Sequence, residues 1–283
     1  FSEKTLAKLE FDKVLKKLRA CCASSLGVEK ALALIPSSRM DEITESLART
    51  TEAREILRRE PSPPLEGIVD IRPHLWKAEK GGILEPEGLI QVASTLRASR
   101  RLKKLLAGDR ADSSRTSARE NKQHDRMAGG LSIGPHLSAL GERLVSMPQL
   151  EERITACIDE QGEMKDSASP ELKRLRRQIN QLQLSVKEKL EQIVRQSETQ
   201  KYLQDPIVTI RRDRYVVPVK REYQQHFPGI VHDQSSSGAT VFMEPMVVVR
   251  INNELRRLEA EEEQEIERIL RQLTLLVSAS VNE

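Results

Sequence analysis

Two long segments with a heptad-like apolar pattern constrain the fold of this chain more than any other feature. In residues 170–202 and 246–283, aliphatic side chains recur mostly at steps of three and four residues, the spacing of one buried stripe on a helix. Ser169, Pro170 and Glu171 supply an N-cap, a first-turn proline and a first-turn acid, which mark the start of the first helix. Each helix would be roughly 50 Å long. We therefore predict an antiparallel coiled-coil lever with a separate element mounted at its tip.

The register of this pair depends on where the chain reverses. With a reversal near residue 227, facing residues have numbers that add to about 450–454, which places Glu262 and Glu265 opposite Lys187 and Lys189. Charge pairing across the seam would then fix the register more than it adds stability.

The segment between the helices, residues 203–245, changes to a β pattern. β-branched runs at 206–210 and 215–219 flank Arg211-Arg212-Asp213-Arg214, which predicts a hairpin that turns at these four residues. Two further extended runs, 229–234 and 239–243, are joined by Ser235-Ser236-Ser237-Gly238, a composition typical of a tight polar turn. A small antiparallel β module is therefore expected at the tip of the lever.

Positive charge is concentrated in this module. The whole chain has 46 Lys+Arg against 43 Asp+Glu, so any nucleic-acid site must be a local patch. Residues 211–221 hold five cations and one acid, Asp213, a net charge of +4. Guanidinium groups and the backbone N–H groups of a serine-rich turn suit phosphate oxygens, without sequence-specific reading. The candidate nucleic-acid-binding residues are Arg211, Arg212, Arg214, Lys220, Arg221, Ser235, Ser236 and Ser237. The same charges would also protect a strand edge from aggregation, and charge alone favours neither interpretation.

Residues 1–168 indicate a helical core of shorter helices. Leu6, Leu9, Val14, Leu15 and Leu18 form an apolar stripe near the start that we expect to be buried, and we interpret Trp76 as a core residue. Residues 108–134 are polar and lack apolar periodicity, which predicts a disordered insertion. The fold class is therefore mainly α: a helical core bundle, a long antiparallel coiled-coil lever, and a small antiparallel β clamp module at its tip.

Other functional classes find little support in the residues. Cys21, Cys22 and Cys157 give neither a disulfide framework nor a metal-binding spacing, and a reducing cytoplasm is expected. No apolar run is long enough for a membrane span. His232, Asp233 and Glu244 are a conceivable acid–base or metal group, but neighbours on a strand point to opposite faces. We predict no catalytic and no metal-binding residue in this chain.

Four longer motifs resemble a known family. They read YLQDPIVTIRRDRYVVPVK at 202–220, PGIVHDQSSSGATVFMEP at 228–245, DSASPEL at 166–172 and NNELRRLE at 252–259. These motifs are similar to those of the bacterial MutS-two family, the recombination-suppressing paralogue of the mismatch-repair protein MutS. The chain begins at Phe1 without Met and has no helix-stop signal at Glu283, so we interpret it as a fragment of a longer protein.

The resemblance implies a part for each segment. Residues 1–168 would form the helical core, 169–202 and 246–283 the lever, and 203–245 the clamp, which contacts DNA or ribosomal RNA. The full-length parent would be a homodimer that suppresses homologous recombination or splits stalled ribosomes. Its ATP and Mg would bind in an ATPase domain, and an endonuclease activity would belong to a small MutS-related domain. No P-loop sequence occurs here, so this fragment is expected to be non-enzymatic and without a cofactor. The alternative is a coiled-coil protein-interaction scaffold without nucleic-acid binding.

Overall fold

The computed structural model describes residues 3–107 and 133–281, and these divide into two compact units. The first unit comprises residues 1–163 and 270–283, and the second comprises residues 164–269. The predicted insertion at 108–134 lies, except for its last two residues, outside the described residues. The sequence predicts a division into three parts, core, lever and clamp, and this division stays a prediction.

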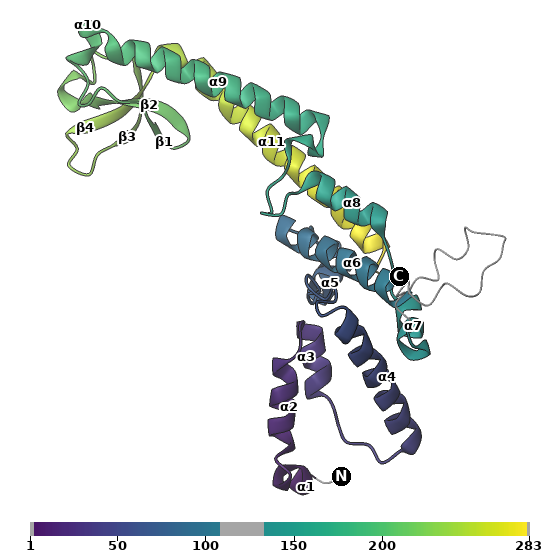
Figure 1. Cartoon of the computed structure of the whole chain (residues 1–283). Helices are drawn as coiled ribbons and strands as arrows, with labels where there is room; N and C mark the ends of the chain where they lie inside the picture. Colours follow the sequence, from purple (N-terminus) through teal and green to yellow (C-terminus); the bar gives the residue numbers. More distant parts are fainter. Residues whose placement is uncertain (1–2, 108–132, 282–283) are drawn as a thin grey trace, which may run out of the picture. The chain divides into compact units, whose positions relative to one another are not determined.

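Helices make up the first unit, as Figure 1 shows. Helix α6 packs against α7 and α8, and Leu89 and Val92 of α6 and Ile154 of α8 are almost fully buried. The last turns of α11 (Met246–Ala279) belong to the same unit, where the Thr274 hydroxyl accepts a hydrogen bond of 3.0 Å from the backbone N–H of Leu84. The helices are α1 (Glu3–Lys8), α2 (Phe11–Ala20), α3 (Ser25–Leu32), α4 (Met40–Arg59), α5 (Arg72–Glu79), α6 (Pro86–Ala107), α7 (Pro135–Glu142) and α8 (Pro148–Cys157).

A buried carboxylate links α6 to α8. Glu151 accepts hydrogen bonds from the Nε atoms of Arg100 and Arg97, each at 3.0 Å. The hydrogen bond from Arg100, followed by that from Arg97, holds the pKa of Glu151 below its usual value despite the burial of the carboxyl. The charge is therefore compensated where the two helices meet.

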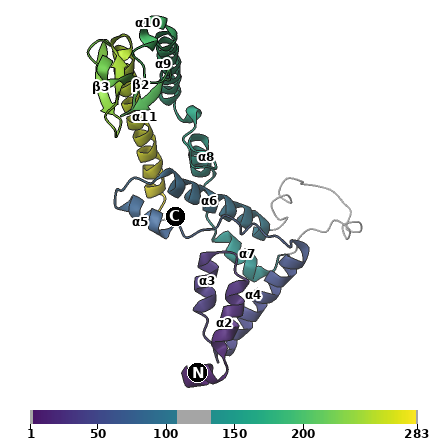
Figure 2. The same ribbon diagram turned by 90° about the vertical axis from the view of Figure 1, so that its left-hand side faces the viewer.

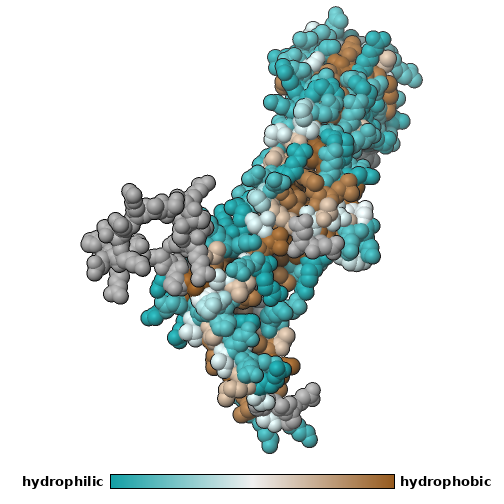
Figure 3. Space-filling view, turned by 90° about the vertical axis from the view of Figure 1, so that its right-hand side faces the viewer, coloured by the Kyte–Doolittle hydropathy of each residue, from teal (hydrophilic) through white to brown (hydrophobic). Residues whose placement is uncertain are grey.

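Two predictions for the first unit were wrong. Of the predicted stripe, Leu9, Val14 and Leu18 are exposed, Leu6 and Leu15 are only half-buried, and α2 has no buried residue. Trp76, on α5, has 64% of its surface exposed and is no core residue. Figure 3 shows apolar surface over the N-terminal helices. A periodic stripe identifies the apolar face of a helix, but the chain must also supply a surface to cover that face. Helix α2 packs mainly against the short helices α1 and α3, which are too small to do so.

The second unit combines two antiparallel helices with one sheet. It contains α9 (Pro170–Arg195), α10 (Ser197–Gln200), and the first part of α11 (Met246–Ala279). The strands are β1 (Thr209–Arg211), β2 (Arg214–Lys220), β3 (Gly229–Gln234) and β4 (Thr240–Pro245), in the order β1-β2-β4-β3 with antiparallel neighbours. The expected mainly α fold with a small antiparallel sheet is confirmed. The sheet lies at the same ends of α9 and α11 in both views (Figures 1 and 2).

Apolar packing joins the sheet to the helices. Val217 and Val219 of β2 and Met243 of β4 belong to one core cluster with Leu190 of α9 and Leu255 of α11. Alternate residues of a strand point to one face, so these side chains define the face of the sheet that is buried against the helices. No helix among the described residues is both long and apolar enough to cross a bilayer.

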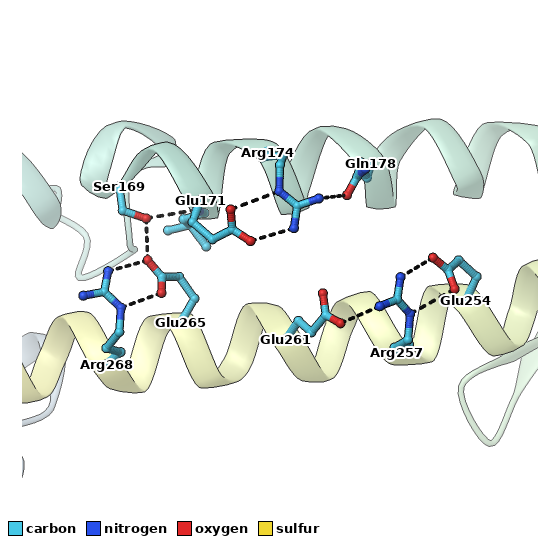
Figure 4. Close-up of polar contacts among 10 residues, drawn as sticks. Ser169, Glu171, Arg174, Gln178, Glu254, Arg257, Glu261, Glu265 and Arg268 are labelled. Atoms are coloured by element: carbon cyan, nitrogen blue, oxygen red, sulfur yellow. Dashed lines mark hydrogen bonds and ion pairs between the residues drawn. The ribbon is translucent and has the colours of Figure 1, made fainter.

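The antiparallel direction of the helix pair follows the prediction, but the predicted register was wrong. Glu262 pairs with Arg176 at 2.7 Å, and Glu265 accepts a hydrogen bond of 2.6 Å from the Ser169 hydroxyl. Figure 4 shows Ser169 and Arg268 meeting at Glu265 between the two helices. Hydrogen bonds from Arg268 and then Ser169 hold the pKa of Glu265 below its usual value.

Along α9, Arg176 and Ser169 lie 13 and 18 residues before the expected partners Lys189 and Lys187, an error of about four to five helical turns. The partner numbers, 176 with 262 and 169 with 265, add to 438 and 434 rather than to the expected values. The connection between the helices runs from Gln196 to Pro245, so its middle lies near residue 220, about seven residues before the assumed reversal. The supercoiling that a coiled coil implies stays a prediction.

Truncation of a buried seam residue tests how much the packing of α9 contributes. Leu190→Ala removes a side chain with 0% exposure, and we expect the free energy of unfolding to fall by about 2–5 kcal/mol. Leu184→Ala on the same helix is the matched control, because Leu184 is 62% exposed and its loss leaves no cavity. Urea unfolding followed by circular dichroism measures both. Equal losses for the two variants would contradict the described packing.

Candidate nucleic-acid interface

The residues predicted to bind nucleic acid lie at two opposite ends of β2. Arg211, Arg212 and Arg214 are at the hairpin that joins β1 to β2, whereas Lys220 is the last residue of the strand and Arg221 follows it. Six steps of about 3.3 Å separate Arg214 from Lys220, so the ends are roughly 20 Å apart. The cationic run therefore supplies two small groups of charges instead of one patch.

Arg214 was predicted to contact phosphate from the surface, but its side chain faces the interior of the module. Its side chain is only 18% exposed, and its Nη1 donates to both carboxylate oxygens of Glu244, at 2.9 and 3.1 Å. Its Nη2 donates to Asn253 Oδ1 at 2.7 Å. Glu244 is completely buried and requires a compensating positive charge. We therefore leave Arg214 out of the candidate surface.

Part of the Arg211 side chain interacts with other residues of the β module. Its guanidinium carbon lies 4.2 Å from the centre of the Phe242 ring, and its Nη1 donates to the Ile210 carbonyl at 2.9 Å. Its Nε is 3.8 Å from Asp233 Oδ2, so an acidic group already faces this cation. The side chain nevertheless remains partly open to solvent.

The hairpin turn has an unusual backbone at its two central residues. The register pairs Arg211 with Arg214, and Arg212 and Asp213 have φ values of 49° and 57°. Two-residue turns of this kind favour Asn and Gly, because positive φ costs other residues roughly 1–2 kcal/mol. Asp213 pairs with Arg256 of α11 at 3.2 Å. Arg212 is exposed and forms no ion pair within the described part of the chain, so the turn presents its charge to solvent.

The other end of β2 gathers cations from neighbouring segments. The backbone N–H of Lys220 donates to the Tyr202 carbonyl at 2.9 Å, and that of Arg221 donates to the Ala239 carbonyl at 3.0 Å. The segment after α10 therefore lies beside β2, with the start of β4 on the far side. This arrangement adds Lys201, which sequence reasoning missed because nothing in its local pattern predicts the pairing next to β2. We name Lys201, Lys220 and Arg221 the basic end.

The contacts of the basic end leave its charges without acidic partners. In the described ranges, none of its three cations is in an ion pair. The Nζ of Lys201 lies 4.8 Å from the Tyr202 ring centre, and that of Lys220 lies 6.0 Å from the ring centre of Tyr223. Arg221 Nη1 donates to Gln234 Oε1 at 3.2 Å, a neutral acceptor. These contacts orient the cations without neutralising them, so their charge is available to an anion.

The serine-rich turn lies beside the basic end. The Ser235 hydroxyl accepts a hydrogen bond from the Thr240 N–H at 3.1 Å, and its carbonyl accepts one from the Gly238 N–H at 2.9 Å. Gly238 has a φ of 70°, a conformation that suits glycine. Ser235 thus supports the turn itself, while Ser236 and Ser237 are exposed. Phosphate contacts by all three serines stay a prediction.

His232 and Asp233 do not show the strand alternation that was predicted to point them to opposite faces. Both contact residues on one face of the sheet, Glu244 and the Arg211 that stacks on Phe242. His232 Nε2 lies 2.6 Å from Glu244 Oε2, whereas Asp233 faces Arg211. A bulge in the β3–β4 ladder falls between Val231 and Asp233, so His232 is the unpaired residue of β3. In the part of the chain that the structure describes, no three His, Cys, Asp or Glu side chains are arranged to hold a metal ion.

Comparison with known proteins supports the resemblance. No family model matches the chain. It is 47% identical to Endonuclease MutS2 of Geobacillus thermodenitrificans over 98% of this chain and 33% of that protein. The MutS2 endonucleases of Pelotomaculum thermopropionicum and Halalkalibacterium halodurans are 47% and 44% identical, over 96% and 99% of this chain. The chain spans about one third of the length of these relatives. These similarities support the MutS2 family.

Relief of the unusual backbone at the hairpin turn should stabilise the module. We expect Arg212→Asn to raise the free energy of unfolding by roughly 1 kcal/mol, because Asn accepts positive φ more readily than Arg. Arg221→Asn, which removes the same charge at a position without positive φ, is the matched control and should not stabilise. Thermal and urea unfolding measure both. A loss of stability in Arg212→Asn would show that the Arg212 side chain supports the fold.

Proposed function

We propose that this chain is the nucleic-acid-engaging core, lever and clamp region of a MutS2 protein. The observation that carries the proposal is the basic end: three cations on neighbouring backbone segments, none paired with an acid in the described residues. Charges arranged in this way attract a polyanion without reading its sequence. The relatives are named endonucleases, which is consistent with nucleic acid as the partner.

The second part of the proposed interface is the hairpin turn. Arg212, and the exposed part of Arg211, would contact phosphates at the other end of β2, roughly 20 Å away. Phosphates follow one another every few ångströms along a strand, so one duplex can contact both ends of the module. We propose duplex DNA as the ligand. Ribosomal RNA is the alternative ligand, and the experiment below compares the two.

The activities of the full-length protein are part of the same proposal. We infer that it dimerises, binds ATP and Mg in a domain outside this chain, and uses the movement of its clamps to suppress homologous recombination or to split stalled ribosomes. An endonuclease activity would also lie outside this chain. The role of the chain itself is to bind and to transmit movement.

Charge removal at the basic end tests the proposal. Lys220→Gln with Arg221→Gln should weaken binding to duplex DNA at least tenfold at low salt, equally for unrelated sequences. The slope of log K against log salt should become shallower by about 2, since each phosphate contact contributes about 0.9. Lys173→Gln with Arg177→Gln removes two exposed cations from α9 and serves as the matched control. Fluorescence anisotropy over a salt series measures both.

The outcomes separate the alternatives. Binding with a salt slope near zero, or no binding, would favour the protein-interaction scaffold. Equal losses in the two double variants would show that position on the module is irrelevant and would contradict the proposed site. Sedimentation with purified ribosomes, carried out with the same variants, shows which polyanion is bound more tightly.

A further inference from the structure

The hairpin that carries Arg211 and Arg212 extends beyond the rest of the sheet. Strand β2 pairs with β4 only at residues 217–220, whereas residues 214–216 pair with β1 alone. Isolated two-stranded hairpins are at best marginally stable in water. Contacts outside the sheet must therefore hold residues 209–216 in place.

Successive residues of this hairpin contact one side of α11. Asp213 pairs with Arg256 at 3.2 Å, and Arg214 Nη2 donates to Asn253 Oδ1 at 2.7 Å. The Asn252 side chain bonds to the backbone of Tyr215, donating to its carbonyl at 3.1 Å and accepting from its N–H at 3.4 Å. We name this set of contacts the hairpin–helix joint.

Glu244 is the buried acceptor at the centre of the hairpin–helix joint. Besides Arg214 and His232, it accepts a hydrogen bond of 2.7 Å from Asn252 Nδ2, and both Glu244 and Asn252 are almost fully buried. One carboxylate thus connects strands β2, β3 and β4 to α11. A buried polar network of this kind has one satisfied arrangement, since each displaced partner leaves a buried polar group without a hydrogen bond. Apolar contacts alone would allow the hairpin to slide along the helix, because they are not directional.

We propose that Glu244 and Asn252 are positioning residues, which make the hairpin and the first turns of α11 one rigid body. When α11 moves, Arg211 and Arg212 would then move with it by the same distance. The joint itself rests on the contacts above. Only its consequence for binding rests on the proposed function.

Amide hydrogen exchange tests the joint directly. In Glu244→Gln and in Asn252→Ala, the amides of residues 209–216 should exchange at least tenfold faster than in the wild type. The amides of Val217, Val219 and Lys220, in the part of β2 that pairs with β4, should change less than threefold. Glu254→Gln is the matched control, because Glu254 is on the same helix but only half-buried and is paired with Arg257. Unchanged exchange at 209–216 would overturn the proposal, as would equal acceleration throughout the second unit.

A double-mutant cycle tests the consequence for binding. Arg212→Ala should weaken DNA binding severalfold in the wild type but less than twofold in Asn252→Ala, because a loose hairpin no longer directs the charge. An equal effect of Arg212→Ala in both backgrounds would overturn the positioning role. If Arg212→Ala has no effect even with the joint intact, the proposed contact at the hairpin fails, and the exchange experiment still decides whether the joint exists.

Discussion

The burial of one carboxylate determines much of the second unit. Glu244 has no exposed surface, so it must be matched by donors, and Arg214, His232 and Asn252 all turn towards it. A buried charge that loses a partner is costly, which makes this arrangement specific even where its net contribution to stability is small. Because the Glu244 carboxylate must be paired, the Arg214 side chain points away from the surface and the hairpin is held against α11. The electrostatic character of the module therefore follows from the needs of its interior as well as from its sequence.

Ion pairing also explains why a run of cations does not amount to one binding surface. Arg211 and Arg214 have acidic partners in Asp233 and Glu244, whereas Lys220 and Arg221 contact an aromatic ring and a neutral amide. The available charge thus shifts towards the basic end, where the segment after α10 adds Lys201. Because exposed charges interact over about 10 Å at moderate salt, two ends roughly 20 Å apart act as separate contacts on a ligand.

Local signals in the sequence were sufficient for the elements but not for their partners. The helix start at Ser169 and the hairpin turn at Arg211–Arg214 were predicted correctly, since capping and turn chemistry act within a few residues. The register of α9 against α11 was not, because it depends on how the intervening module is centred. The exposure of Trp76 and the inward orientation of Arg214 depend on surfaces and carboxylates far away in the sequence. Lys201 was missed for the same reason.

The hairpin turn brings these constraints together. Asn-Gly would suit its backbone better than Arg212-Asp213, since both residues have positive φ. Each of the two residues, however, has a side chain that the preferred pair would lack. Asp213 reaches Arg256 and contributes to the hairpin–helix joint, while Arg212 presents a charge that has no acidic partner in the residues the structure describes. Backbone strain persists where the surrounding structure enforces it. Here the joint supplies that enforcement, so the contacts that orient the hairpin also make its strained tip tolerable.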